Sequence, residues 1–157
     1  RDRECPQWPL TFLYPLWDVQ YHENYRARLC AGDEDLGRIP KERCYDIYAE
    51  ARLVISVPHS DSSPRSVYEA IFCGAPVATT ASRWVDDLPP SMRSRVLLVE
   101  PDRAGWLARA LIWADKCAST PFEPCADAIA RYDQFDVARS IYERVYRPIL
   151  AAGKGSA

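Results

Sequence analysis

Short apolar runs alternate with amphipathic stretches along most of this chain. Apolar runs predict strands at 10–16, 52–57, 75–79 and 95–99, with a very short strand at 36–39. Helical spacing and helix-end residues predict helices at 41–50, 64–73, 102–116, 126–132 and 136–150, and the polar segment 22–30 is a further candidate. Strands and helices therefore alternate from one end of the chain to the other.

Residues at the ends of these elements sharpen the predictions. Ser63 is a favourable N-cap, and Pro64 suits the first position of the helix that follows it. Cys73 and Gly74 end that helix, because glycine readily adopts the left-handed conformation of a helix stop. Asp102 is placed to cap the next long helix. The β-branched run 52–57 predicts a strand buried on both faces.

The alternating order indicates an α/β fold. We expect a Rossmann-like three-layer α/β/α arrangement with a mostly parallel sheet. A length of 157 residues predicts a single domain. We place this domain at residues 1–150 and expect the tail, 151–157, to fray.

Composition narrows the class of protein. Apolar residues make up 48% and charged residues 27% of the chain, which is typical of a folded soluble domain. The net charge of −2 provides no general attraction to nucleic acid, so we expect no nucleic-acid partner. No run approaches the roughly 18 apolar residues of a membrane span. The expected location is the cytoplasm, with the membrane surface as the one alternative.

The six cysteines do not predict a metal site or a disulfide framework. No two of them have the CxxC spacing, and only two histidines accompany them. We expect scattered reduced thiols and no bound metal.

Glu69 is the most informative single residue. It interrupts an otherwise apolar helix, where an unpartnered carboxylate costs free energy. Either another protein group, such as a core arginine or tyrosine, or a ligand must therefore meet it. A second acid, Asp61, stands in the loop before the same helix.

The segment before Glu69 has the composition of an anion site. In an open α/β sheet, ligands bind beyond the carboxyl ends of the strands, and free backbone N–H groups at a helix N-terminus favour phosphate. Ser62, Ser63 and Arg65 lie at that end of the helix. A phosphate site beside a hydroxyl-binding carboxylate suits a nucleotide, although the sequence contains neither GxGxxG nor GxxxxGK[ST].

These residues resemble the donor-binding domain of GT-B glycosyltransferases, in particular the retaining, nucleotide-sugar-dependent enzymes of family 4. Members of that family carry a segment close to PS…EG…LLEAMACGxPVVAT, which reads here VPHSDSSPRSVYEAIFCGAPVATT. Upstream, LGRIPKERCYDIYAEARLVISVP resembles the family pattern, as do RVLLVEPDRAGWLARAL and YDQFDVARSIYERVYRPIL downstream. The resemblance spans about 36–150.

The resemblance implies a role for each matching residue. Glu69, in the second of the family's two acidic positions, would bind the ribose hydroxyls, and Asp61, in the first, would bind the transferred sugar near the reaction centre as the catalytic residue. The remaining donor-binding positions would be Ser62, Ser63, Pro64, Arg65 and Ser66 near the sugar and diphosphate, with Arg38 and Ile39 near the nucleobase. The donor would be a UDP- or GDP-sugar, with no metal and no other cofactor.

The implied reaction is retaining transfer of a hexose to a carbohydrate or lipid-linked acceptor, as in polysaccharide biosynthesis. The family's basic GR…KG segment and its acceptor domain have no match here, so we expect an N-terminally incomplete donor domain that is inactive alone. Asp61 also stands where glutamate is commoner. One alternative is a glycosyltransferase-like module that has lost catalysis and serves binding or assembly. Another is an unrelated α/β protein, such as a receiver-like signalling domain.

Two further groups of side chains have more than one interpretation. Trp8 and Phe12 belong to an aromatic cluster that either packs in the core or stacks on a base or sugar. Arg139, Arg144 and Arg147 form either a solvated helix face or a surface toward an acceptor domain or a membrane in the parent protein.

Overall fold

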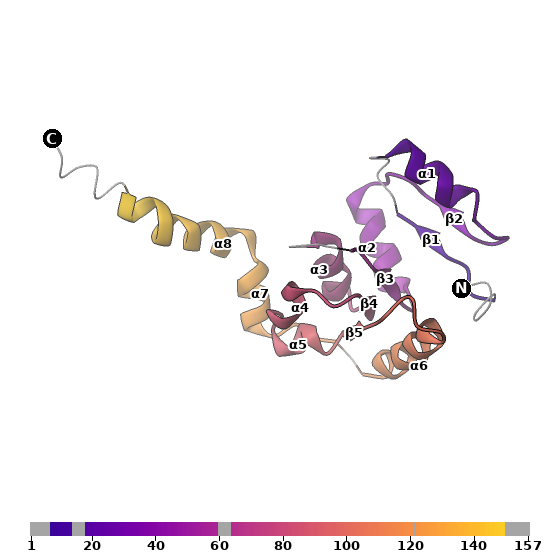
Figure 1. Ribbon diagram of the computed structural model, residues 1–157. Helices are drawn as coiled ribbons and strands as arrows, with labels where there is room; N and C mark the ends of the chain where they lie inside the picture. The colour runs from indigo at the N-terminus through magenta and orange to yellow at the C-terminus, as the bar shows by residue number, and fades with distance from the viewer. Residues whose placement is uncertain (1–6, 14–17, 60–63, 121, 150–157) are drawn as a thin grey trace.

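The computed structural model describes residues 7–13, 18–59, 64–120 and 122–149. Their strands form two parallel sheets (Figure 1). The smaller sheet pairs β1 (Thr11–Phe12) with β2 (Glu34–Asp35). The larger sheet has the order β3 (Val54–Ser56), β4 (Val77–Thr79), β5 (Val96–Leu98). The predicted α/β fold with parallel strands is confirmed.

Helices connect the strands and extend beyond the last one. Their bounds are α1 (Val19–Arg26), α2 (Lys41–Glu50), α3 (Arg65–Phe72), α4 (Arg83–Asp86), α5 (Pro90–Arg93), α6 (Trp106–Ala118), α7 (Ala126–Tyr132) and α8 (Gln134–Ile141). A π-helical turn, η1 (Tyr142–Tyr146), continues α8. The described residues contain no helix that is both long enough and apolar enough to cross a membrane.

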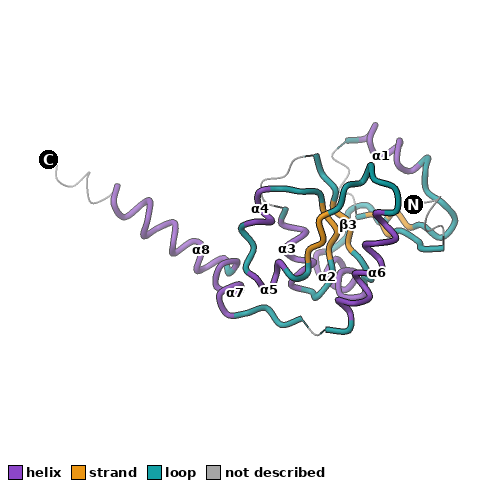
Figure 2. The backbone as a smooth tube through the Cα atoms, turned by 60° about the horizontal axis from the view of Figure 1, so that its bottom comes forward, coloured by secondary structure: helices purple, strands orange, loops and turns teal. Residues whose placement is uncertain are grey.

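Helices cover both faces of the larger sheet. The main core joins α3, α5 and α7 to one face through Ile71, Met92 and Ala128, each of which is fully buried. On the other face, Leu107 and Leu111 of α6 pack with Leu53, the residue before β3. Val54 packs against the main core, on the face opposite to Leu53, as expected because neighbouring strand residues point to opposite faces. The result is the expected α/β/α layering (Figure 2).

The prediction that strand 52–57 is buried on both faces is wrong. Ile55 retains 36% and Val57 39% of their exposure. Leu53 packs against the cluster on α6, whereas Ile55 and Val57 do not belong to that cluster. The apolar pattern was therefore correct for a strand, but it did not reveal how far the covering helix extends.

The main-chain groups of Ile55 also face away from the sheet. Val54 donates its N–H to the carbonyl of Pro76, the residue before β4, at 2.9 Å. Because the N–H and C=O groups of successive residues point to opposite sides of a parallel strand, those of Ile55 point away from β4. The main-chain groups of Thr11 in β1 likewise point away from their partner strand, because the carbonyls of Leu10 and Phe12 accept the hydrogen bonds from Glu34 and Leu36. The two sheets thus share no backbone hydrogen bonds among the described residues, although the guanidinium of Arg52 lies 3.7 Å from the ring centre of Trp8.

Several predicted boundaries need correction. The short strand is not 36–39 but Glu34–Asp35, because Gly37 turns the chain with φ +57°. The first helix begins at Val19, where the Asp18 carboxylate accepts the N–H of Tyr21, and not at 22. The strand predicted at 10–16 pairs at Thr11–Phe12, and its end lies outside the described residues.

Two predicted helix caps are also wrong. Asp102 lies in a turn, and the helix starts at Trp106 after Gly105, whose φ of +76° favours glycine. The helix carrying Glu69 starts at Arg65, and Pro64 occupies the N-cap position with a non-helical ψ of 89°. Ser63 lies outside the described residues. The stop at Cys73 and Gly74 is confirmed by the Gly74 φ of +88°.

The end of the chain, α8 with η1, forms an arm beside the domain, whereas α7 packs in the main core. The prediction of 126–132 as a helix is confirmed, and the last helix begins at Gln134 because Asp133 caps it. Figure 1 shows α8, in yellow, extending away from the sheets. Neither α8 nor η1 has a buried residue, and the apolar positions that the 136–150 pattern placed on one face stay 40–64% exposed: Val137, Ile141, Val145 and Ile149.

Candidate functional site

The candidate site lies where the chain leaves β3 and enters α3. The hydroxyl of Thr80, after β4, donates to the carbonyl of Pro58, after β3, at 2.7 Å. This bond joins the two loops at the carboxyl end of the sheet, which is the usual ligand edge of such folds. The predicted residues Asp61, Ser62 and Ser63 lie outside the described residues.

The start of α3 presents backbone donors. Arg65 and Ser66 are exposed, and within the described part of the chain their N–H groups make no hydrogen bond. The N-cap residue, Pro64, is buried and has no side chain that can cap the helix. Free donors and the positive end of the helix dipole at this position favour an anion.

Glu69 lies one turn further along α3. Its neighbours Val67, Ala70 and Ile71 are buried in the main core, whereas the Glu69 side chain keeps 23% of its exposure. The helix thus holds its apolar face against the sheet and leaves the carboxylate at the edge of the core. At a rise of about 1.5 Å per residue, Glu69 is about 6 Å along the helix axis from Arg65.

The protein group that meets Glu69 is Lys41. The Lys41 Nζ lies 2.7 Å from Oε1 of Glu69, and the two side chains keep 56% and 23% of their exposure. The hydrogen bond that Lys41 donates to the Glu69 carboxylate is the main cause that raises the pKa of Lys41 above its ordinary value of 10.5. Lys41 therefore stays protonated, and the need for a polar partner that the sequence indicated is met by α2.

The surroundings of this ion pair are partly buried. Burial, with a smaller contribution from the nearby charges that include Glu69, raises the pKa of Tyr48 to about 12. Burial also raises the pKa of the Cys73 thiol, again with a contribution from Glu69. The Tyr45 ring centre lies 5.8 Å from Nζ of Lys41, so the ammonium lies between a carboxylate and an aromatic face. Tyr48 and Cys73 stay neutral at ordinary pH and cannot supply a second charge.

Arg38 and Ile39 lie in the loop between β2 and α2. Arg38 is exposed and Ile39 is half-buried. The loop ends at Pro40, and the next residue is Lys41. The structure therefore brings the loop predicted to meet a nucleobase close to Glu69 through Lys41, which the sequence reasoning missed. The one available signal was that a lysine opens a helix, where the dipole disfavours a cation.

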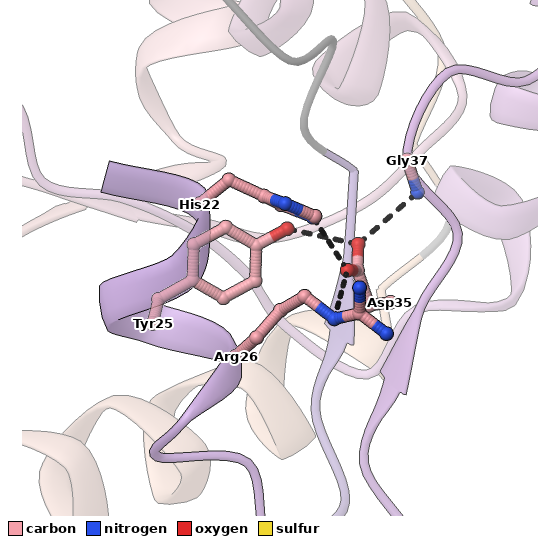
Figure 3. A network of polar contacts seen from close by, with 5 residues as sticks. All are labelled: His22, Tyr25, Arg26, Asp35 and Gly37. Atoms are coloured by element: carbon pink, nitrogen blue, oxygen red, sulfur yellow. Dashed lines mark hydrogen bonds and ion pairs between the residues drawn. The ribbon is translucent and has the colours of Figure 1, made fainter. Parts of the chain in front are cut away.

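A second polar cluster, around Asp35, holds the start of this loop at Gly37 (Figure 3). The Asp35 carboxylate accepts hydrogen bonds from the Tyr25 hydroxyl and the Gly37 N–H, and lies 2.8 Å from Nε2 of His22 and 3.6 Å from Nε of Arg26. The Tyr25 ring also stacks on Phe12 with centres 5.0 Å apart. This cluster joins α1 to β1 and β2, and the bond from Gly37 attaches the start of the loop to it.

Burial raises the pKa of the Asp35 carboxyl, but the donors around it outweigh that effect. Hydrogen bonds from Tyr25, His22 and Gly37 lower the pKa, and the net result is a value below the ordinary 3.8. Asp35 is therefore ionised throughout the neutral range. Its role here is structural.

One buried group at the same edge was not expected from sequence. Thr79, the last residue of β4, is fully buried, and its hydroxyl has no hydrogen-bond partner among the residues that the structure describes. A hydroxyl in this state costs free energy comparable to a lost hydrogen bond.

Comparison with known proteins yields a match to a solved structure. No protein-family model matches the sequence, and no curated protein is significantly similar to it. Among solved structures, the chain is similar to AviGT4, a glycosyltransferase involved in avilamycin A biosynthesis, with a TM-score of 0.62 and 23% identity. The match covers 91% of this chain and 44% of that chain. This similarity shows that the chain has a glycosyltransferase-like α/β fold, and that it spans less than half the length of this neighbour.

Proposed function

We propose that this chain is the donor-binding domain of a GT-B glycosyltransferase and binds the nucleotide part of a nucleotide-diphospho-sugar. The observation that carries the proposal is the placement of Glu69 about one turn from the N–H groups of the exposed residues Arg65 and Ser66, which make no hydrogen bond among the described residues. A carboxylate can accept hydrogen bonds from both hydroxyls of a ribose, while the helix end accepts the diphosphate.

The finer assignments belong to the same proposal. Arg38 and Ile39 contact the base, Ser62, Ser63 and Pro64 approach the sugar and diphosphate, and Asp61 faces the transferred sugar as the catalytic residue. The donor is a UDP- or GDP-sugar, the enzyme is of the family 4 type, and transfer to a carbohydrate or lipid-linked acceptor occurs with retention and without a metal. Because the acceptor side of such a site comes from a second domain, this chain alone binds the donor but does not catalyse transfer.

A catalytically inactive binding or assembly module is the second candidate. The ion pair between Lys41 and Glu69 favours it, because a carboxylate already held by a lysine has a sufficient structural role. The two candidates differ in one measurable respect: the donor-binding domain loses nucleotide affinity when Glu69 is changed, whereas in an inactive module that uses Glu69 only to hold Lys41, nucleotide affinity does not depend on Glu69.

The test is ligand-observed NMR of the chain with UDP, GDP and ADP, each added to wild type, Glu69→Gln and Glu50→Gln. Glu50 is an exposed glutamate at the end of α2 and serves as the matched control. We expect one nucleotide to bind wild type and the control variant, and its affinity to fall about tenfold in Glu69→Gln, the size of one charge-assisted hydrogen-bonding group. No binding to wild type, or equal binding to both variants, would overturn the proposal.

A further inference from the structure

Lys41 occupies a position that local helix physics disfavours. It is the first residue of α2, and the positive end of a helix dipole repels a cation. The helix also lacks a side-chain cap, since Pro40 holds the N-cap position. The ion pair with Glu69 at 2.7 Å offsets this cost in the free protein.

The same ion pair involves the residue assigned to the ribose. Among the described residues, Lys41 is the one cation within ion-pair distance of Glu69. A ribose diol that approaches the carboxylate must therefore share Glu69 with the ammonium or displace it. Because the Lys41 side chain is 56% exposed and ends a flexible four-carbon stem, it can move without disturbing the core.

The nearest new partner for a displaced ammonium is the ligand itself. Glu69 is about 6 Å along the axis from the start of α3, so a nucleotide that contacts both would pass its phosphates close to Nζ. The other described basic residue at this end of α3, Arg65, is exposed. Of these two basic residues, Lys41 is the one already held beside the Glu69 carboxylate, so it is placed to balance part of the charge of a diphosphate near Glu69.

From this arrangement we propose that Lys41 is a positioning residue with two partners: it is the counter-ion of Glu69 in the free domain, and it pairs with the diphosphate when a nucleotide is bound. The inference rests on the proposed function. It assigns to α2 part of the phosphate recognition, and it makes the free ion pair a competitor of ribose binding.

Three probes separate the two roles of Lys41. Uridine or guanosine presents the ribose alone, inorganic pyrophosphate presents the diphosphate alone, and UDP or GDP presents both. The variants are Lys41→Met, Glu69→Gln and, as the matched control, Arg43→Met. Arg43 is an exposed cation of the same helix, paired with Asp46 at 3.8 Å, so its loss reports general electrostatic effects. All dissociation constants are measured by NMR titration on the full chain at two salt concentrations.

The two roles predict opposite patterns. Lys41→Met should weaken the nucleoside diphosphate and pyrophosphate by about tenfold and leave the nucleoside unchanged or bound more tightly, because Glu69 is then free. Glu69→Gln should weaken the nucleoside diphosphate and the nucleoside and spare pyrophosphate. Arg43→Met should change none of the three by more than about twofold.

The outcomes also distinguish this inference from the proposed function. If wild type binds a nucleoside diphosphate but Lys41→Met binds it equally well, or loses all three probes to the same extent, the inference is wrong and the proposed function stands. If wild type binds none of the probes, both fail. Thermal unfolding of each variant checks that any loss common to all probes does not arise from loss of the fold.

Discussion

The guanidinium of Arg95 donates a hydrogen bond from Nη1 to the carbonyl oxygen of Cys117 at 2.8 Å. A second hydrogen bond runs from Nη2 to the carbonyl of Thr120, and the guanidinium lies over the ring of Phe122. Arg95 precedes β5 and is only 5% exposed, so it fixes the C-terminal end of α6 to the sheet from inside the core. A cation is favoured at this end of a helix by the macrodipole.

We therefore expect Arg95→Met to lower the free energy of unfolding by about 2 kcal/mol, because two part-buried hydrogen bonds from a charged donor to main-chain carbonyls are lost. Arg95→Lys should recover only part of this loss, since an ammonium lacks the planar fork that reaches both oxygens. Urea unfolding followed by circular dichroism measures the effect. Arg103→Met, at an exposed turn position, is the control and should stay within about 0.5 kcal/mol of wild type. Equal effects of Arg95→Met and Arg103→Met would show that the hydrogen bonds of Arg95 do not stabilise the fold.

Asp35 predicts how stability depends on pH. Its pKa is lower in the folded protein than the ordinary 3.8 of an unfolded chain, so the unfolded state binds the proton more readily. The stabilisation is fully present above 3.8 and is lost as the pH falls through the lower, folded value. We expect Asp35→Asn to be less stable at neutral pH and to lack this part of the acid-induced loss. Urea unfolding at a series of pH values from about 6 to about 3 tests it.

The control for Asp35 is Asp46→Asn. Asp46 is 63% exposed and pairs with Arg43 at 3.8 Å, so its removal should leave the pH dependence close to that of wild type. A parallel acid dependence in Asp35→Asn and wild type would show that the cluster of Figure 3 does not hold α1 on the sheet through an ionised carboxylate.

Ile55 predicts a difference in amide exchange along the larger sheet. Its N–H faces away from β4, whereas Val54 and Val77 donate to Pro76 and Arg95 at 2.9 and 2.8 Å. We expect the Ile55 amide to exchange with deuterium at least about 100-fold faster than that of Val77, because an edge amide that has no partner among the described residues needs no opening event. Residue-resolved NMR exchange gives both rates. Similar protection at Ile55 and Val77 would mean that another segment covers this edge in solution.

How much of the fold could be predicted from sequence depends on how local the signal is. The stop at Gly74 and the helix Ala126–Tyr132 were correct because a glycine with φ above zero and an apolar spacing act within a few residues. The starts at Asp102 and Ser63 failed for a related reason. Capping propensity alone does not fix a helix start: these helices begin after Gly105 and Pro64, neither of which makes a side-chain cap hydrogen bond.

The candidate site divides in the same way. The sequence by itself determined that the chain alternates strands and helices and that Glu69, on a mostly apolar helix, needs a polar partner. Only the tertiary structure decided that the partner is Lys41 and that Ile55 is left partly exposed. Pattern and propensity report forces between residues that are close along the chain. Ion pairing and burial depend on which elements meet in space, and for this protein the packing of α2 beside α3 and the reach of α6 over β3 set both.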